Sequence, residues 1–531
     1  MTMRTWTNMV IAAALMLGWA AGAAAELQNV QVGGELRIRG YWWRASFNDS
    51  PAIPATVMPQ VRWPAWCLRG RPIGDSVGGQ NVISYWDWND RGSDYKMVEQ
   101  RTVAYVRAGF TDNVTGYIAL DSCDIWGEDF RSNYVTGVDS RAASTDDVEV
   151  YEAYIEAADI AGYPIRLRLG RQELVLGDGW LVGNNTRRPE FSGLSFDGIR
   201  ATYATDVVSV DAFWAKLNER MAVEEDGDVD LYGLYASYTG IENVSLDAYW
   251  LWLRDARALK DTNFGWFGEG IEDLLSVDDY DVTNLHTIGL RAAGTWNALD
   301  FNADLAYQFG NASQVGFLFK PRFYGDDDAS YDSWAGALEV GYTLDTAWHP
   351  RFYLGGAYFE GEDNRDISFW EWLNPFNRSE ASVSFNRLFS DVSYSVFIDE
   401  MGEMSNFWTV RGGVSVKPTD RIEAGVHAAY LASVESFDLP LHSRIGRLRL
   451  IWLQNLSFWT QPNEDTLGVE AGLWARYRYS NDLTFEAGWT HLFVGSGLAE
   501  GNYNDYNGLL NNGGTDDDDA DYFYLETELR F

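Results

Sequence analysis

The sequence predicts an all-β fold, namely a transmembrane antiparallel β-barrel of about 18 strands with short periplasmic turns and long extracellular loops. Three observations predict it. Apolar and polar residues alternate along many segments, as expected for strands with one face toward lipid and the other toward water. The connections between these segments alternate between very short and long, and the final segment is an amphipathic strand that ends in Phe531.

The N-terminus predicts export from the cytoplasm. Arg4 precedes an apolar run over residues 10–21, which ends in the small residues Ala23 to Ala25. This is the pattern of a secretory signal peptide that is cleaved before Glu26, and the run is shorter than the ~20 residues of a bilayer-spanning helix. We therefore expect a signal peptide over 1–25 and one barrel domain over 26–531.

The composition of the rest of the chain favours a barrel over a soluble periplasmic protein. The sequence has 24 Trp, 29 Tyr and 27 Phe together with 51 Gly, but only 13 Pro. Aromatic girdles and glycine-tolerant strands account for this mixture. Since no long apolar stretch follows the signal, we expect the protein to lie in the outer membrane, with its lipid as partner.

Charge and cysteine content narrow the function further. The formal net charge is −38, which argues against nucleic acid as a partner. Only two cysteines occur, Cys67 and Cys123, and both fall near the same predicted rim. One disulfide and two separate thiols are both compatible with an oxidising compartment, but disulfides do not hold the fold together.

The alternation is clear in residues 467–479, where Val469 and Leu473 lie on one face and Glu470 and Arg476 on the other. Applied to the whole chain, this pattern predicts strands at 30–47, 97–111, 114–127, 148–159, 163–178, 196–205, 207–219, 228–239, 244–255, 284–296, 299–313, 331–345, 349–363, 405–417, 421–435, 465–479, 482–497 and 520–531.

The connections support a barrel with both ends of the chain on the same side. Short ones include 112–113, 161–162, 297–298, 418–419 and 480–481, and long ones include 48–96, 128–147, 256–283, 364–404, 436–464 and 498–519. Bacterial barrels have tight periplasmic turns and longer outer loops, and an even strand number follows. A β-helix or sandwich also uses alternating strands, but no fixed repeat period is visible to support a solenoid.

The polar faces of the strands predict a charged lumen. Arginines occupy the water-facing positions Arg37, Arg39, Arg101, Arg107, Arg166, Arg168, Arg200, Arg291, Arg411, Arg476 and Arg478. Acidic residues alternate with them at Glu99, Asp121, Glu152, Asp211, Asp247, Asp304, Glu423, Glu470, Glu486, Glu526 and Glu528. The arginines can present a planar fork to carboxylates of a solute, or they can pair across strands and brace the wall.

Other acidic residues gather in predicted outer loops, at 224–226, 326–328 and 516–519. Solvated loops are the simplest interpretation of such runs. Calcium binding is an alternative because carboxylates suit Ca²⁺, although no EF-hand spacing is present. We predict no other cofactor.

Enzyme motifs are missing from the sequence. There is no His-Glu-x-x-His zinc motif, no Gly-x-Ser-x-Gly elbow and no phosphate-binding loop. A Ser-His or Asp-His pair assembled across strands stays an alternative for the five histidines. Because this many strands enclose a channel, we predict a protein that is not an enzyme.

The last strand carries an assembly signal. Phe523, Leu525, Leu529 and Phe531 share one face of residues 522–531. A C-terminal aromatic residue on an amphipathic final strand resembles the signal that the barrel-assembly machinery of the outer membrane reads, so this machinery is an expected partner.

A family resemblance lies in residues 166–200, which read RLRLGRQELVLGDGWLVGNNTRRPEFSGLSFDGIR. The segments at 170–174, 177–179 and 196–198 resemble the Gly-Arg-Gln-Glu-Leu strand, Gly-Asp-Gly turn and Phe-Asp-Gly motif of the bacterial alginate-export outer-membrane channel family. Residues 99–101 and 126–127 resemble its early hairpin. The resemblance is clear over 97–205 and looser from 405 onward, and the middle matches in architecture only.

The resemblance implies a monomeric channel of 18 strands that exports an acidic exopolysaccharide with periplasmic secretion proteins as partners. It also implies a cationic lumen, in which Arg101, Arg168 and Arg171 contact the anion, or in which Arg171 braces a loop. The sequence departs from the family in its charge-mixed lumen and in the short turn 480–481, where the alginate channel has a long periplasmic gate. The identity of the polymer and the gate therefore stay open.

The sequence thus predicts an outer-membrane channel that exports an anionic, alginate-like exopolysaccharide through a hydrated lumen. A general diffusion porin for small anions or sugars is the first alternative. An outer-membrane barrel enzyme or a surface adhesion scaffold is the alternative from another class.

Overall fold

The structure is a computed structural model. It describes residues 29–44, 95–111, 113–126, 148–186, 193–219, 228–256, 282–311, 329–361, 381–397, 405–434, 439–440, 442–445, 448–451, 460–461, 465–496 and 519–531. The predicted signal peptide over 1–25 lies outside the described residues.

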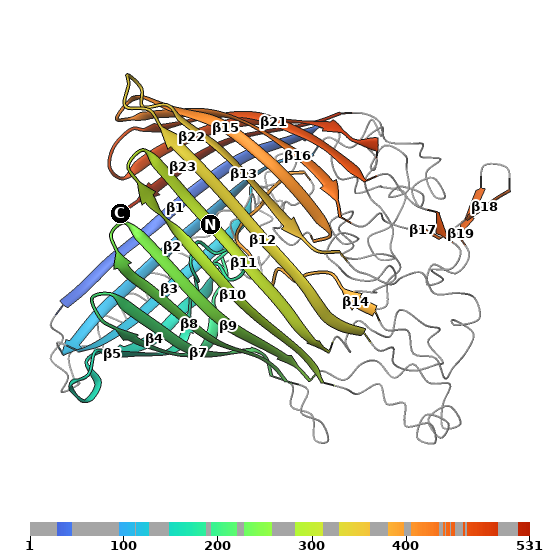
Figure 1. Cartoon of the computed structure of the whole chain (residues 1–531). Helices are drawn as coiled ribbons and strands as arrows, with labels where there is room; N and C mark the ends of the chain where they lie inside the picture. The colour runs from blue at the N-terminus through green and yellow to red at the C-terminus, as the bar shows by residue number, and fades with distance from the viewer. Residues whose placement is uncertain are drawn as a thin grey trace, which may run out of the picture.

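A closed antiparallel barrel of 18 strands forms the molecule, as predicted, and neighbouring strands follow one another along the chain (Figure 1). The strands are β1 (Asn29–Arg44), β2 (Tyr95–Thr111), β3 (Val114–Ile125), β4 (Glu149–Ala157), β5 (Ile165–Gln172), β6 (Phe196–Ala204), β7 (Val208–Asn218), β8 (Val229–Ile241), β9 (Val244–Asp255), β10 (Thr283–Trp296), β11 (Leu299–Asn311), β12 (Ala329–Thr343), β13 (Arg351–Phe359), β15 (Phe407–Thr419), β16 (Ile422–Ser433), β21 (Thr466–Arg478), β22 (Leu483–Val494) and β23 (Ala520–Arg530).

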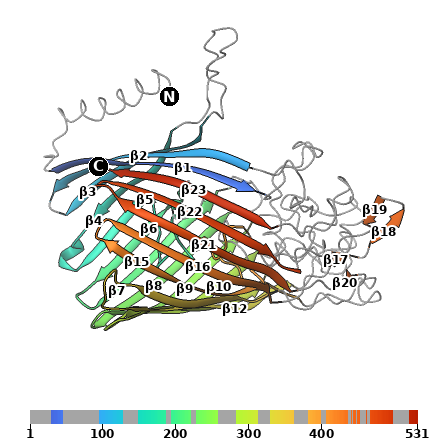
Figure 2. The same ribbon diagram turned by 90° about the horizontal axis from the view of Figure 1, so that it is seen from above.

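The wall closes where β1 pairs with β23, and the two strands lie side by side in both views (Figures 1 and 2). The register at this seam runs from Glu35 opposite Arg530 to Arg44 opposite Asp521. Closure leaves no free strand edge in the wall, so every strand finds backbone hydrogen-bond partners on both sides.

Short elements outside the wall complete the described structure. They are the 3₁₀ turn η2 (Ile160–Gly162), the strand β14 (Ala381–Val383), which pairs in parallel with β12, and the short strands β17 (Leu439–Pro440), β18 (His442–Ile445), β19 (Leu448–Ile451) and β20 (Thr460–Gln461). No helix in the described ranges is long and apolar enough to cross a membrane.

The outer face of the barrel is apolar, as the alternation predicts. Leu290, Leu305, Leu338 and Leu354 lie on consecutive strands β10 to β13, and each has more than half of its surface exposed, up to 65% for Leu354. Such a band would be unfavourable in water, whereas lipid tails solvate it.

The two ends of the barrel differ in their connections. At one end, which we call the turn end, strands are joined at 112–113, 158–164, 205–207, 242–243, 297–298, 344–350, 420–421 and 479–482. Asn243 and Asn297 have φ of 57° and 54°, the left-handed conformation that tight hairpin turns require and Asn tolerates. The opposite end, which carries the long connections, is the loop end.

Three predicted boundaries are wrong. The turn predicted at 418–419 lies at 420–421, because the ladder is irregular between Val416 and Thr419 and β15 continues to Thr419. The strand predicted at 163–178 ends at Gln172, and the one predicted at 349–363 ends at Phe359. In the segment after Gln172 the chain leaves the wall and enters the barrel.

The barrel lumen as candidate functional site

The register places almost all of the predicted arginines on the inner face of the barrel. Residues that lie opposite each other on neighbouring strands point to the same face of the sheet. One residue of known orientation in each strand therefore shows whether every other residue of that strand points into or out of the barrel. Arg37 lies opposite Arg101, and Arg168 lies opposite Arg200, with buried or inward polar residues two positions away. The residues on the inner face are Arg37, Arg39, Arg101, Arg107, Arg166, Arg168, Arg200, Arg291, Arg411, Arg476 and Arg478.

Arg171 is the exception, and its predicted place in the lumen is wrong. Its neighbour in the strand, Gln172, is buried inside the barrel. Because successive residues of a strand point to opposite faces, Arg171 points outward. Its guanidinium pairs in bidentate fashion with Asp197, at 2.8 Å and 2.9 Å. The alternative prediction, that Arg171 braces a loop, is wrong in its place as well, because Asp197 lies in strand β6 and the pair joins two wall strands.

The pairing of Arg171 explains why two separate sequence motifs belong together. Strands β5 and β6 align Gly170 with Gly198, and Gln172 with Phe196. The Gln172 amide donates to the carbonyl oxygens of both glycines, at 3.2 Å each. The Gly-Arg-Gln and Phe-Asp-Gly segments thus form one cross-strand unit, with an ion pair outside and an amide link inside.

In the loop-end half of the lumen the ion pairs are buried. Arg39 Nε donates to Glu526 at 2.6 Å, and Arg101 Nε donates to Asp121 at 2.9 Å. The Arg101 guanidinium also lies over the Tyr151 ring at 4.9 Å, while its Nη2 is buried without a hydrogen-bond partner among the described residues. These pairs brace the wall, as the second interpretation of the arginines expected.

Two segments fold into the lumen, and we call them inner segment A (173–186) and inner segment B (384–397). They bind each other through the backbone, because Phe389 N donates to Leu181 O and Asp391 N donates to Gly179 O, both at 2.9 Å. Trp180 Nε1 donates to the Tyr394 hydroxyl at 3.2 Å. The prediction that 364–404 is an outer loop is wrong for inner segment B, whose apolar residues have a core to join inside the barrel.

The inner segments contact the wall on several sides. Trp43 of β1 packs edge-on against Phe397, and Phe196 of β6 packs against Phe389. Gln308 of β11 exchanges two hydrogen bonds of 2.7 Å with the backbone of Asn386. Apolar residues of β13, β15, β16 and β21 to β23 belong to the same buried cluster, so the segments form a partition across the loop-end half.

Aromatic contacts stabilise the partition. The Tyr394 ring is buried between the guanidinium groups of Arg387 and Arg411, at 5.3 Å and 5.0 Å from its centroid. Burial raises the pKa of Tyr394 to about 12, against the opposing effect of the two cations. The ring therefore stays neutral, and the cations interact with its face.

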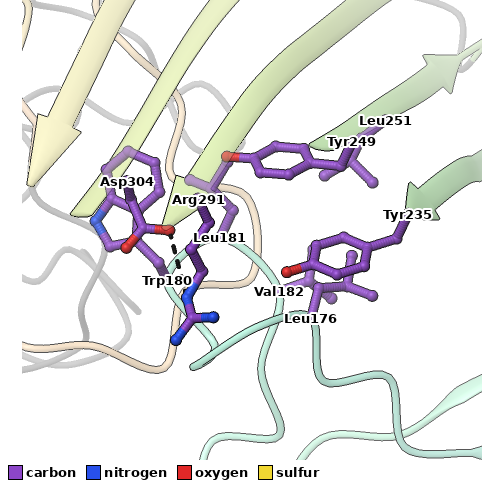
Figure 3. A pocket seen from close by; sticks show the side chains of 9 residues that line it. All are labelled: Leu176, Trp180, Leu181, Val182, Tyr235, Tyr249, Leu251, Arg291 and Asp304. Carbon is purple, nitrogen blue, oxygen red and sulfur yellow. Dashed lines mark ion pairs between the residues drawn. The ribbon is translucent and has the colours of Figure 1, made fainter. Parts of the chain in front are cut away.

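A small pocket lies between inner segment A and the wall (Figure 3). Figure 3 shows Leu176, Trp180, Leu181 and Val182 of the segment facing side chains of β8 to β11. Arg291 donates to Asp247 at 3.0 Å and lies 3.9 Å from Asp304. The Tyr249 hydroxyl is buried there without a partner among the described residues, and the space suits a water molecule rather than a sugar ring.

The ion pairs near the turn end are arranged differently. In some of them the guanidinium is far more exposed than the carboxylate beside it, at 57% against 20% for Arg478 and Glu423 and 47% against 13% for Arg166 and Glu156, whereas Arg351 and Asp300 are equally exposed, at 29% and 31%. Arg530 is 70% exposed and Glu35 is 21% exposed. Arg166, Arg478 and Arg530 therefore present exposed positive charge to a solute in this half, although acidic residues nearly balance them in number.

The sequence model of the alginate export family matches residues 89–454. This chain belongs to the alginate export family. The match includes the cross-strand unit of β5 and β6 and the region between 205 and 405, where the sequence shows the resemblance in architecture only. It ends before the last three wall strands.

Three of the solved structures that are similar to this family member serve as examples. They are Pseudomonas aeruginosa OccD3 (OpdP), with 12% identity, a TM-score of 0.47 and coverage of 96% of this chain and 93% of that chain; Acinetobacter baumannii OccAB4, with 10%, 0.47, 96% and 100%; and Pseudomonas aeruginosa OprD, with 12%, 0.46, 96% and 97%. No curated protein sequence is similar enough to count as a relative.

Some lumenal residues of this family member were missed by the sequence reasoning. Arg351 donates to Asp300 and Glu339 from the first residue of β13, and alternation with Tyr353 would have revealed it. Arg387 lies on inner segment B, where no periodic pattern marks its direction.

The predictions of metal binding and of cysteine pairing are among those that stay untested. Most of the acidic loop residues lie outside the described residues, namely 224–226, 326–328 and most of 516–519. The described residues themselves contain no group of three or more His, Cys, Asp or Glu side chains that could hold a metal ion. Cys123 Sγ lies 3.4 Å from Glu99 Oε1, whereas Cys67 lies outside the described residues. A calcium site and a disulfide thus remain predictions.

Proposed function

We propose that this protein is an outer-membrane channel that exports an anionic, alginate-like polysaccharide through its hydrated lumen, and that no bond is made or broken. The family match supports polysaccharide export. The observation that carries the anionic substrate is the unequal exposure of the ion pairs near the turn end, where guanidinium groups cover their carboxylate partners.

Electrostatics favours this substrate. A guanidinium bound to one carboxylate keeps further N–H groups in its planar fork, and these can donate to a second carboxylate. Because each arginine is already partly neutralised, a passing polyanion is attracted without being held tightly. This balance suits a polymer that has to move.

The placement of the barrel supports export as the direction of transport. In outer-membrane barrels the short turns face the periplasm, so the exposed arginines would meet a polymer as it enters. We further propose that the channel works as a monomer and takes its polymer from periplasmic secretion proteins at this end.

Ion selectivity in a planar bilayer tests the proposal. We expect the purified protein to favour anions under a salt gradient, and uronate oligomers to interrupt the current more than neutral oligomers of equal length. The double variant Arg166→Ser, Arg478→Ser should lower the anion preference by roughly twofold or more, because it removes two exposed charges from the lumen.

Arg171→Ser is the matched control, since it removes an exposed arginine from the outer face and should leave selectivity unchanged. A wild-type channel that favours cations, or one that responds to neutral but not to acidic oligomers, would contradict an anionic substrate. A response to small sugars alone would favour a diffusion porin instead.

A further inference from the structure

Three tyrosines form a row on the inner face near the turn end. Tyr105 of β2, Tyr117 of β3 and Tyr154 of β4 stack in succession, with ring centroids 5.6 Å and 5.0 Å apart and planes inclined by 27° and 20°. The register aligns Tyr117 with Tyr154 and places Tyr105 two residues from Arg107, on the same face as Arg101. All three side chains are half-buried, so each keeps exposed surface in the lumen.

The hydroxyl groups of this tyrosine row have no hydrogen-bond partner among the described residues, unlike those of three other lumenal tyrosines. Tyr41, Tyr235 and Tyr524 donate to the carboxylates of Glu99, Asp247 and Glu486, at 2.9 Å, 2.8 Å and 2.7 Å. A phenol hydroxyl both donates and accepts. The row therefore offers three such groups in line to a solute.

Two arginines border the row, and they differ in how they are held. The Arg168 guanidinium lies 4.2 Å from the centroid of Tyr154 and donates to Glu156 at 2.6 Å. Arg107 is opposite Tyr117 in the register and is exposed. Every other arginine that the sequence placed on the inner face has a carboxylate within 4 Å, but among the described residues Arg107 has none.

Glycines on both neighbouring strands make room for the row. Gly33 of β1 is opposite Tyr105, and a Cβ there would collide with the tyrosine ring. Gly170 of β5 is opposite Tyr154, and its φ of 123° is one that residues with a side chain rarely adopt. The rings thus lie over strands that carry no side chain at those positions, an arrangement that stabilises glycine in a sheet.

We propose that the tyrosine row and Arg107 form a binding subsite for an acidic sugar unit, which is a deeper statement of the proposed export function and rests on it. The carboxylate of a uronate accepts hydrogen bonds from the Arg107 guanidinium, which no carboxylate within the described part of the chain occupies. The sugar hydroxyls exchange hydrogen bonds with the phenols of Tyr117 and its neighbours. Because the subsite lies near the turn end, it would be met early by a polymer that enters there.

Binding of trigalacturonate to the purified full-length protein in detergent, measured by titration calorimetry, tests the subsite, with maltotriose as the neutral probe. The wild-type protein should bind trigalacturonate more tightly. Arg107→Gln should weaken this binding by about tenfold or more and remove the preference over maltotriose, because a hydrogen bond to a charged group is lost. Tyr117→Phe and Tyr154→Phe should each weaken it by roughly threefold, since the ring stays and only the hydroxyl is lost.

Arg171→Gln and Tyr203→Phe are matched controls, because both residues lie on the outer face, and neither should change the affinity. A heat-dependent gel shift confirms folding of every variant. If the wild type prefers trigalacturonate but the Arg107 and tyrosine variants bind as it does, the subsite is wrong and the export proposal stands. If the wild type binds neither probe preferentially, the subsite is overturned and the anionic substrate loses its support as well.

Discussion

A single carboxylate joins two arginines at the closing seam of the barrel. Glu526 lies 3.1 Å from Arg37 Nε and 2.6 Å from Arg39 Nε, and the residue is only 7% exposed. Two guanidinium groups thus share one buried carboxylate. Removing one partner of a buried ion pair lowers the free energy of unfolding far more than removing one partner of an exposed pair. The remaining buried charge is neither paired nor solvated by water.

Glu526→Gln should therefore lower the free energy of unfolding by about 3 to 5 kcal/mol. Urea unfolding from lipid vesicles, followed by tryptophan fluorescence, measures this change. Asp197→Asn provides the comparison, because it breaks an exposed pair with Arg171 and should cost less than about 1 kcal/mol. Equal effects of the two substitutions would show that burial does not govern these pairs.

The inner-face arginines could be predicted from the sequence because side chains alternate along a strand. Whether a residue points inward or outward therefore depends only on whether its position in that strand is odd or even. This reasoning failed for Arg171, which the family motif suggested but which has the opposite parity to Arg168. It also missed the tyrosine row, because that row depends on the register of three strands, which parity alone does not provide.

At the scale of elements, the alternation of apolar and polar residues explains which strand boundaries could be predicted and which could not. The wall strands agree closely with the predicted ones because each carries its own alternating pattern. Strand β5 was predicted too long because apolar residues recur at every second position beyond Gln172, although Leu174 and Leu176 fall on the face that is polar within β5. Further along inner segment A, Trp180 donates to Tyr394 of inner segment B, which is 214 residues away, and no local pattern encodes such a contact.

The partition built by the two inner segments should limit conduction. Trp180 lies at its centre, with its ring centroid 5.8 Å from that of Phe359 and 6.3 Å from that of Phe385. Trp180→Ala should raise the single-channel conductance and its fluctuations, because a buried tryptophan leaves a large cavity and a lost hydrogen bond. Planar bilayer recordings measure this.

Trp296→Ala is the control for the partition, because Trp296 is an exposed residue on the outer face at the turn end. It should leave the conductance unchanged. If Trp180→Ala conducts like the wild type, the inner segments do not stand in the conducting path.

At the scale of the whole molecule, closure depends on the two ends of the chain. Gly34 and Phe531 exchange backbone hydrogen bonds of 2.9 Å and 3.0 Å, directly beyond the ladder of β1 and β23. A Cβ on Gly34 would meet the Phe531 ring, so the terminal aromatic residue sits against a position that only glycine fits.

Phe531→Ala should reduce the amount of folded barrel in the membrane of a producing cell, because we expect the assembly machinery to read this residue. The heat-dependent gel shift and resistance to protease measure the folded fraction. Phe493→Ala, which also removes an exposed aromatic residue from the outer face, should have a smaller effect. The same loss in both variants would attribute the effect to lipid contact rather than to recognition of the C-terminus.

The unequal exposure of the lumenal ion pairs also makes the protein electrically polar along its axis. Arg478 and Arg530 are exposed near one mouth, whereas the other half holds buried ion pairs such as Arg101–Asp121 and the apolar inner segments. Anions would therefore accumulate at one mouth only, and a voltage of one sign would drive them into the pore while the opposite sign depletes it. The current should rectify, and the polarity of that rectification would report which way each inserted molecule faces.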